Sequence, residues 1–390
     1  MMRDPDTRPA PDIGGSTSPR RLRVLHLILM LGETNGQYNE HCLPMIGERD
    51  LTICTYFVPQ LTPPTEIALY PGDGTVRGFF RALDRALDAG PYDIIHAHAP
   101  GTGLFLLLGV LARRDRARLR RSLVYTVQDS FYDYKPRDKL MMVAPLAGFR
   151  RVVFCSRSAY DSLPRLLKRV TGRRWRVVQN AADLDRVDRA ISSVPARADV
   201  DRFAVLSVGR IEPVKDPVGV VEAFAGALGD DRNCRLVFIG AGQLEDRVAG
   251  RIRELGLDER VSMKGLIPRD DVFVACAQAD VFISTSHGEG LPVAVVEAMA
   301  AGCPVVLSDI APHREVVDGA DFVPLVPPGD VDGFARELRR FRSMPEDERR
   351  EIGRRAREHV EARFTLPIMH AGIAAVYRET MGTSTGRSGR

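Results

Sequence analysis

The sequence predicts an α/β protein made of two doubly wound, Rossmann-like domains. Apolar, strand-like runs alternate with helical segments along the chain, which is typical of parallel sheets covered by helices. The 390 residues suffice for two domains of ordinary size, and a polar stretch at 192–201 interrupts the alternation near the middle. No repeat of 20–50 residues is visible, which argues against solenoids and propellers.

Each half of the chain supplies six expected strands. In the first half the strands are expected at 22–29, 51–57, 93–96, 123–127, 151–155 and 175–178, with long helices at 76–89 and 103–121. In the second half the strands are expected at 203–208, 235–239, 261–264, 281–284, 305–307 and 322–325. The expected organisation is a disordered tail at 1–20, a first domain at 21–195, a second domain at 196–362 and a disordered tail at 381–390.

Composition places the protein among soluble globular chains. Hydrophobic residues make up 44% and charged residues 27% of the chain. The six cysteines are scattered without a CxxC pair, which argues against a disulfide framework or a zinc ribbon and favours reduced thiols in the cytoplasm. The longest apolar run, 104–112, is too short to span a bilayer.

The loops after the strands of the second half carry the informative residues. Ligands of such sheets bind beyond the carboxyl ends of the strands, so these loops are expected to face the cleft between the domains. Gly209, Arg210 and Lys215 follow the first of these strands. A guanidinium fork and an ammonium group five residues apart can clamp a diphosphate, although ordinary surface loops also carry such pairs.

The next two loops would suit a nucleotide. Gly240 follows the second strand and permits a close approach of the backbone, as in many βα turns. Leu266 and Ile267 follow the third strand and are apolar enough to pack against a flat base.

The fourth loop leads into the run HGEGLPVAVVEAMAAGCPVV at 287–306, which is small and apolar apart from two glutamates. A buried carboxylate without partners is costly, so Glu289 and Glu297 either face solvent or hold a polar ligand. Gly288 and Gly290 predict a flexible turn, and Pro292, after Leu291, suits the first position of a helix that ends before a left-handed Gly302. The alanines of that helix leave little room for a solvated face.

A helix N-terminus offers free N–H groups to phosphate. Further along the same helix, Glu297 could accept hydrogen bonds from the two vicinal hydroxyls of a ribose, and Glu289 at the turn could accept them from a sugar. A nucleoside diphosphate-sugar would use all of these contacts together: base packing, ribose, diphosphate and sugar.

The run EGLPxxxxEAMAxGxPVV, together with GRIEPVKDP upstream, resembles the donor-site signature of the family-4 retaining glycosyltransferases, the glycosyl transferases group 1 of GT-B fold. The resemblance is dense in the second half. In the first half it is thinner and rests on DIIHAHAP at 93–100, VVFCSRSAYDSL at 152–163 and VVQNAADLDRV at 177–187.

This resemblance implies a retaining glycosyltransferase of cell-envelope polysaccharide or glycolipid synthesis that needs neither metal nor cofactor. Arg210 and Lys215 would bind the diphosphate, and Glu289 and Glu297 would bind the transferred sugar and the ribose. His98 would lie beside the transferred sugar. The resemblance also implies that a helix at 363–380 crosses back to the first domain. The acceptor, held by the first domain, would be a glycan, a lipid-linked molecule or a small molecule.

The first domain departs from the family pattern at one loop. Where family members carry a Gly-Gly-Ala-Glu-like run after the first strand, this chain reads LGETNGQYNEH at 31–41, so Gly32, Gly36 and Tyr38 are the acceptor-side candidates. Asp129 is the first-half carboxylate at a strand end that could act as a nucleophile. His96 and His98 would face the same way on their strand, but no carboxylate or cysteine follows to complete a metal site.

Charge is unevenly distributed along the chain. Residues 21–195 hold 26 basic and 17 acidic residues, whereas residues 196–390 hold 26 and 31. An arginine cluster at 113–121 contains no aromatic residues, which disfavours nucleic-acid binding. It fits either an anionic membrane surface on the cytoplasmic side or a solvated helix face. Two other functions stay open: a nucleotide-sugar 2-epimerase of the same fold, or a non-catalytic sugar-nucleotide-binding subunit.

Overall fold

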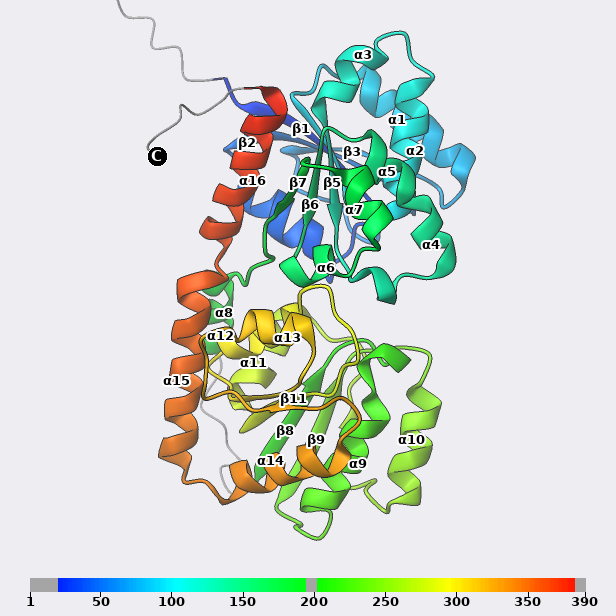
Figure 1. The fold of residues 1–390 in the computed structure, drawn as a ribbon. Helices are drawn as coiled ribbons and strands as arrows, with labels where there is room; N and C mark the ends of the chain where they lie inside the picture. Colours follow the sequence, from blue (N-terminus) through cyan, green and yellow to red (C-terminus); the bar gives the residue numbers. More distant parts are fainter. Residues whose placement is uncertain (1–19, 194–201, 383–390) are drawn as a thin grey trace, which may run out of the picture.

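The computed structural model describes residues 20–193 and 202–382, which form two parallel sheets, one in each half of the chain (Figure 1). The first sheet has the order β3-β2-β1-β4-β5-β6-β7 and the second β10-β9-β8-β11-β12-β13. The strands of the first are β1 Leu22–Ile28, β2 Arg49–Thr55, β3 Ile67–Tyr70, β4 Ile94–Ala97, β5 Leu123–Val127, β6 Arg151–Phe154 and β7 Trp175–Val177. Those of the second are β8 Phe203–Val208, β9 Cys234–Ile239, β10 Val261–Met263, β11 Val281–Ser284, β12 Val305–Ser308 and β13 Leu325–Val326.

Helices cover both faces of each sheet. The first half contains α1 Val76–Asp88, α2 Pro100–Leu111, α3 Arg116–Leu119, α4 Pro136–Met141, α5 Val143–Gly148, α6 Arg157–Asp161, α7 Arg165–Thr171 and α8 Leu184–Ser192. The second half contains α9 Pro217–Leu228, α10 Glu245–Glu254, α11 Arg269–Gln278, α12 Val293–Ala300, α13 Ala311–Val316, α14 Val331–Ser343, α15 Glu346–Arg363 and α16 Leu366–Met381. Short helical turns are η1 Gln37–Cys42, η2 Leu43–Met45, η3 Arg120–Ser122, η4 Phe131–Asp133 and η5 Pro213–Lys215.

Three sequence expectations about elements are wrong in detail. The edge strand β3 was not expected, because it is only four residues long and is flanked by Pro64 and Pro71. The expected helix at 103–121 is broken into α2 and α3, with Arg113 in the break paired to Asp88 at 2.6 Å. The last strand begins at Leu325 rather than at residue 322.

Alternate residues of the central strands pack on opposite faces of the first sheet. Leu25 and Leu27 of β1 join the core beneath α1 and α2, whereas Val24 and Ile28 join the core beneath α16. The strands of a parallel sheet are buried on both faces, which explains why they are apolar almost throughout.

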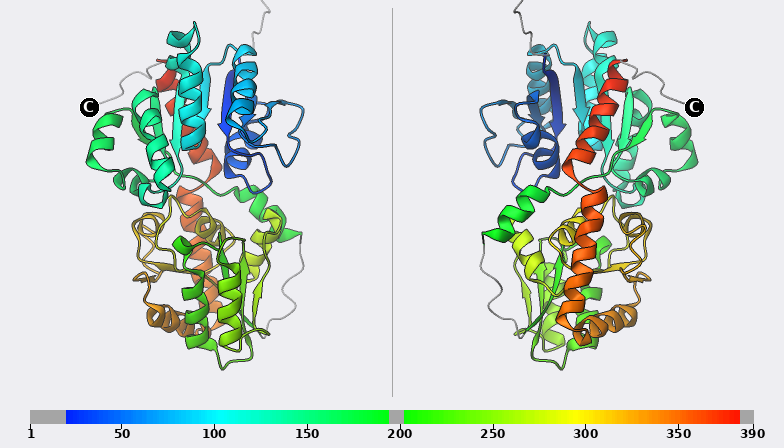
Figure 2. Two further views of the ribbon diagram at one scale, coloured as in Figure 1. Left: turned by 90° about the vertical axis from the view of Figure 1, so that its right-hand side faces the viewer. Right: turned by 90° about the vertical axis from the view of Figure 1, so that its left-hand side faces the viewer.

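The C-terminal helix crosses back to the first domain, as the family resemblance implied. In Figures 1 and 2 α15 runs along the second domain and α16 continues along the first. Tyr377 of α16 is fully buried there, and Glu379 accepts hydrogen bonds from Arg151 and Arg176, both at 3.1 Å. Within the described residues, no helix combines the length and the apolar character needed to cross a bilayer.

Candidate active site

A cavity of about 570 Å³ lies between the domains, at the carboxyl ends of β8, β9 and β11 in the second domain and of β5 in the first. Ten of the eleven donor-site residues expected from the sequence line it. They are Gly209, Arg210, Lys215, Gly240, Leu266, Ile267, Glu289, Leu291, Pro292 and Glu297. The eleventh, Gly290, lies outside the cavity wall. The structure therefore brings four separate loops of the second domain together at one place.

Two cations of the loop after β8 face this cavity. Arg210 is exposed, and its side chain makes no hydrogen bond or ion pair with the residues that the structure describes. Lys215 ends the turn η5 and forms an ion pair with Glu289. Burial raises the pKa of Asp129 on the opposite wall, and the charges of Arg210 and Lys215 act against that rise. The cavity thus contains positive charge that an anion could neutralise.

Glu289 is held by its own domain and is ionised. Its side chain is 10% exposed, pairs with Lys215, and accepts a hydrogen bond from Ser286 Oγ at 2.8 Å. Burial alone would raise the pKa of Glu289, but Lys215, His313 and Ser286 together hold this pKa below its ordinary value. An ionised carboxylate at this position can accept hydrogen bonds from hydroxyl groups.

Glu297 is not on a solvated helix face, so that alternative from the sequence is wrong for this residue. Its side chain is 9% exposed and pairs with Arg269, the first residue of α11. The helix containing it, α12, begins after Pro292 without a side-chain cap, and Gly302 has the expected left-handed conformation at φ 74°. The sequence argument missed Arg269, which carried no signal beyond its position just after the third loop.

Two glycines are required by close backbone contacts. A Cβ on Gly240, where φ is 137°, would lie 1.9 Å from the carbonyl oxygen of Gly209. A Cβ on Gly290 would lie 2.0 Å from the carbonyl oxygen of Gln128 in the first domain. Ser156 of the first domain also donates to the Gly290 carbonyl at 2.6 Å. Gly290 thus allows the two domains to approach, rather than lining the cavity.

Only some of the site residues expected in the first domain line the cavity. Gly36 and Asp129 line the cavity, whereas Gly32 does not, and Tyr38 is buried in the core beneath α16. His98 is 4% exposed and also lies off the cavity wall. The loop at 31–41 instead forms the π-helix η1, which places Glu40 and His41 on the wall. Neither was singled out from the sequence, since the loop departs from the family pattern there.

A second cavity, of about 740 Å³, also reaches Glu289. Its first-domain wall includes Asp133 and Arg157, and its second-domain wall includes Glu315. Burial raises the pKa of Asp133 to about 6, with the neighbouring charges of Asp129 and Glu289 adding to that rise. Because Glu289 lines both cavities, they meet at this residue.

The two halves of the chain match two family models. Residues 50–186 match "Glycosyltransferase Family 4", and residues 188–359 match "Glycosyl transferases group 1". This chain belongs to the family 4 glycosyltransferases.

Curated relatives of this glycosyltransferase are glycosyltransferases named for several different acceptors or pathways. WcaL of Escherichia coli K12, named for colanic acid biosynthesis, is 30% identical over 47% of this chain, and the match spans 46% of that relative. A D-inositol 3-phosphate glycosyltransferase of Saccharomonospora viridis is 29% identical over 77% of this chain and 73% of the relative. An Escherichia coli galactosyltransferase that acts on GlcNAc-diphosphoundecaprenol is 24% identical, over 76% of each chain.

Solved structures share the GT-B fold of this glycosyltransferase. Sucrose-phosphate synthase from Thermosynechococcus elongatus superposes with a TM-score of 0.76, at 18% identity over 93% of this chain and 100% of that one. Anabaena HepE in complex with UDP and glucose superposes with a TM-score of 0.73, at 17% identity over 92% of this chain and 100% of that one.

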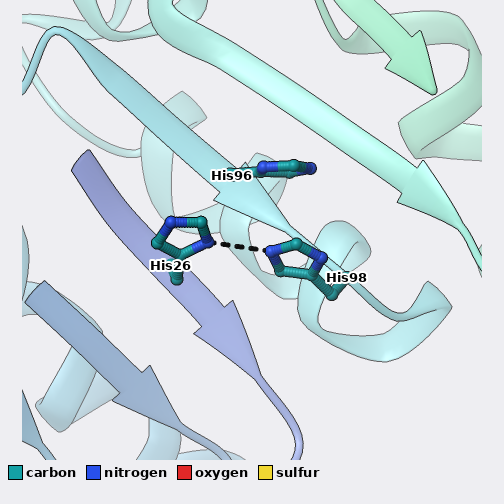
Figure 3. A group of neighbouring side chains, drawn as sticks. All are labelled: His26, His96 and His98. Atoms are coloured by element: carbon teal, nitrogen blue, oxygen red, sulfur yellow. Dashed lines mark hydrogen bonds between the residues drawn. The ribbon is translucent and has the colours of Figure 1, made fainter. Parts of the chain in front are cut away.

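Behind the cavity wall, this glycosyltransferase has a buried histidine cluster at the ends of β1 and β4 (Figure 3). His26, His96 and His98 each offer one candidate metal-ligating nitrogen, and these nitrogens lie within 4.8 Å of one another. However, both ring nitrogens of His96 are hydrogen bonded, at 2.8 Å to Tyr377 and 2.6 Å to Thr126.

Within the same cluster His26 and His98 share a hydrogen bond of 2.9 Å. The ring centroids of His96 and His98 lie 4.0 Å apart and the ring planes are tilted by 31°, so the two imidazoles pack against each other. Burial lowers the pKa of all three imidazoles well below the ordinary value. The cluster is therefore a neutral hydrogen-bonded core that supports the wall formed by His41, whose ring centroid lies 5.2 Å from that of His98.

Proposed function

We propose that this enzyme transfers a sugar from a nucleoside diphosphate-sugar to an acceptor hydroxyl with retention of anomeric configuration. The observation that carries the proposal is the grouping of Arg210, Lys215, Glu289 and Glu297 around one interdomain cavity, beside the uncapped N-terminus of α12. The names of the relatives favour an acceptor in cell-envelope polysaccharide or glycolipid synthesis.

The donor would lie across the loops of the second domain. Leu266 and Ile267 would pack against the base, and Glu297 would accept hydrogen bonds from the ribose hydroxyls. The diphosphate would lie between the first N–H groups of α12 and Arg210, whose guanidinium has no protein partner among the described residues. Because Lys215 is paired with Glu289, these two residues mark the junction of diphosphate and sugar.

We favour same-face substitution as the chemical step. The bond between the anomeric carbon and the diphosphate oxygen breaks, the acceptor oxygen bonds to that carbon on the same face, and the acceptor proton moves to the departing phosphate oxygen. The protein then contributes positioning and charge: Arg210 and Lys215 stabilise the negative charge that develops on the diphosphate. No step requires a metal ion, because these cations supply the positive charge.

The first domain would hold the acceptor. The second cavity gives a hydroxyl a route to Glu289, past Asp133 and Arg157. Asp129 on the main cavity wall is the carboxylate that a double displacement would use as nucleophile. His98, which the family resemblance placed beside the sugar, would act only through His41, because it lies off the wall.

Product analysis tests this proposal. Purified protein is incubated with UDP-, GDP- and ADP-sugars and envelope lipid acceptors, and the product anomer is read by NMR. We expect release of one nucleoside diphosphate, a product with the anomeric configuration of the donor, and unchanged transfer in EDTA. Donor turnover without acceptor would instead show an epimerase, and binding without any turnover would show a non-catalytic subunit. Loss of transfer in EDTA that Mg²⁺ restores would contradict metal independence.

We also propose peripheral association with an anionic membrane through the outer face of the first domain. Leu108 and Leu111 of α2 are 49% and 42% exposed, and the chain then runs into an exposed basic segment. Arg113 is unsuited to lipid contact, because it pairs with Asp88 and Asp115. The exposed arginines of the segment are Arg114, Arg116, Arg118, Arg120 and Arg121, of which Arg118 pairs with Asp115.

Each basic residue near an anionic surface contributes about 1 kcal/mol, and salt screens this attraction. We therefore expect co-sedimentation with phosphatidylglycerol-containing vesicles at low salt and its loss at high salt. Failure to bind at either salt concentration would leave the arginines as a solvated helix face.

A further inference from the structure

Across the cavity, two carboxylates share one guanidinium. Arg269 Nε donates to Glu297 Oε1 at 3.0 Å and Arg269 Nη2 donates to Glu40 Oε1 at 3.2 Å; a further bond joins Nη2 to Glu297 Oε1. The three side chains are 11%, 9% and 5% exposed for Arg269, Glu297 and Glu40, and all three line the cavity. This is a buried group of two carboxyl groups and one guanidinium.

The hydrogen bonds from Arg269 end on a single oxygen of Glu297. In the part of the chain that the structure describes, Glu297 Oε2 receives no protein hydrogen bond, and Oε2 is not among the fully buried atoms left without a partner. An oxygen that keeps its acceptor capacity at a cavity wall is available to a ligand. The guanidinium thus fixes the direction of the carboxylate and leaves one oxygen for an incoming hydroxyl.

Glu40 brings the first domain into this arrangement. It lies on η1, after the first strand, and its backbone carbonyl accepts a hydrogen bond from His370 of α16 at 2.6 Å. A second link lies beside it, because Arg186 of α8 contacts both Asp270 of α11, at 2.6 Å, and Asn39 of η1, at 3.3 Å. The start of α11 is therefore connected to the first domain at two neighbouring points.

We propose that Arg269 is the positioning residue of the ribose site: it orients Glu297 toward the ribose hydroxyls, and through Glu40 it links this site to the first domain. The inference rests on the proposed function, since it takes a nucleoside diphosphate as the ligand and Glu297 as the ribose contact. Arg269 itself touches the carboxylates and not the reacting atoms.

Ribose discrimination tests the inference. Calorimetric titration with UDP, GDP and ADP identifies the diphosphate that binds tightest, and the titration is repeated with its 2′,3′-dideoxy counterpart. In the unmodified protein the ribonucleotide should bind on the order of tenfold or more tightly, as expected for charge-assisted hydrogen bonds. Arg269→Gln should lose most of that preference by weakening the ribonucleotide alone. Arg269→Lys, which keeps the charge but not the fork, should retain an intermediate preference.

Two further variants separate positioning from folding. Arg349→Gln removes a similarly buried guanidinium of the same domain (14% exposed, paired with Asp280), away from the cavity. It should lower the melting temperature and leave both affinities unchanged. Glu40→Gln should keep the ribose preference, since Arg269 still holds Glu297, and should increase the radius of gyration in solution as the link to the first domain weakens.

Equal weakening of ribonucleotide and dideoxynucleotide by Arg269→Gln would overturn the inference and make Arg269 a phosphate contact or a structural residue. Loss of the ribose preference in Glu40→Gln would overturn it too, because Glu40 would then contact the ribose itself. Absence of any ribose preference in the unmodified protein would refute the role of Glu297 in the proposed function, and not the link between Arg269 and Glu297.

Discussion

The two domains differ in how their site residues are held. In the second domain, the cavity residues come from short loops that directly follow buried strands. These loops lie side by side at one edge of the sheet, so their side chains meet at the cavity. In the first domain, the wall is formed by the π-helix η1 and by the loop after β5, supported from behind by the histidine cluster. The sequence can thus predict a ligand-binding edge from the positions of the strand ends. It cannot predict which residues of an irregular turn such as η1 will line a cavity.

The largest expected effect is at Arg210 in the second domain. Arg210→Gln should lower the transfer rate by roughly 10²–10³, the usual cost of losing one preorganised charge contact to the transition state. The melting temperature should stay unchanged, because the Arg210 side chain forms no hydrogen bond or ion pair with the described residues. Steady-state kinetics measures the transfer rate and thermal denaturation measures the melting temperature. Arg114→Gln, which removes an exposed arginine of the first domain, is the control. A rate close to that of the unmodified protein would remove Arg210 from the diphosphate site.

Glu297→Ala should come next, acting on binding rather than on rate alone. Removing the acceptor of two ribose hydrogen bonds costs roughly 1.5–3 kcal/mol for each before compensation. The affinity for the free nucleoside diphosphate should therefore fall at least tenfold. Calorimetry on the folded variant measures it, and an unchanged dissociation constant would be incompatible with a ribose contact at Glu297.

The same difference between the two domains explains which parts of the fold and the site could be predicted from the sequence. Arg210, Lys215, Glu289 and Glu297 could be singled out because strand ends and a helix N-terminus fix where their backbones lie. Arg269 could not, because its importance comes from a contact with Glu40, 229 residues earlier in the chain, and no local pattern encodes such a pairing. Tyr38 was expected on the acceptor side but is buried in the core, because the sequence does not show which side of η1 packs inward.

The first-domain wall can be tested with two histidines. His41→Ala should lower the transfer rate by about tenfold or more, since His41 lines the cavity. His98→Ala should mainly destabilise the fold, by about 1–3 kcal/mol, because it leaves His26 without its partner. Kinetics and chemical denaturation distinguish them. The reverse result, with His98 essential for transfer and His41 silent, would restore the position that the family resemblance gave to His98.

The smallest expected effect is the contribution of Glu40 to the pH dependence of the free energy of unfolding. Burial raises the pKa of Glu40 to about 7 from an ordinary 4.5, while Arg269 acts against that rise and Glu297 and Asp183 add to it. The folded state therefore binds the proton more tightly than the unfolded state, so the free energy of unfolding should fall as pH rises from about 4.5 to 7 and then level off.

Glu40→Gln should remove this contribution, on the order of 1–3 kcal/mol across the interval, and flatten the profile. Urea denaturation at several pH values measures it. Parallel profiles for the variant and the unmodified protein would show that Glu40 does not titrate in this range.

The central claim is that the loops of the second domain hold a nucleoside diphosphate-sugar. Hydrogen–deuterium exchange with and without saturating UDP-, GDP- or ADP-sugar tests it most directly, because it reports where the ligand binds. One of these donors should slow amide exchange at 209–216, 240–242 and 287–297, with smaller changes around η1. Exchange that stays unchanged in these loops with all three donors, or slows only in the first domain, would contradict the account.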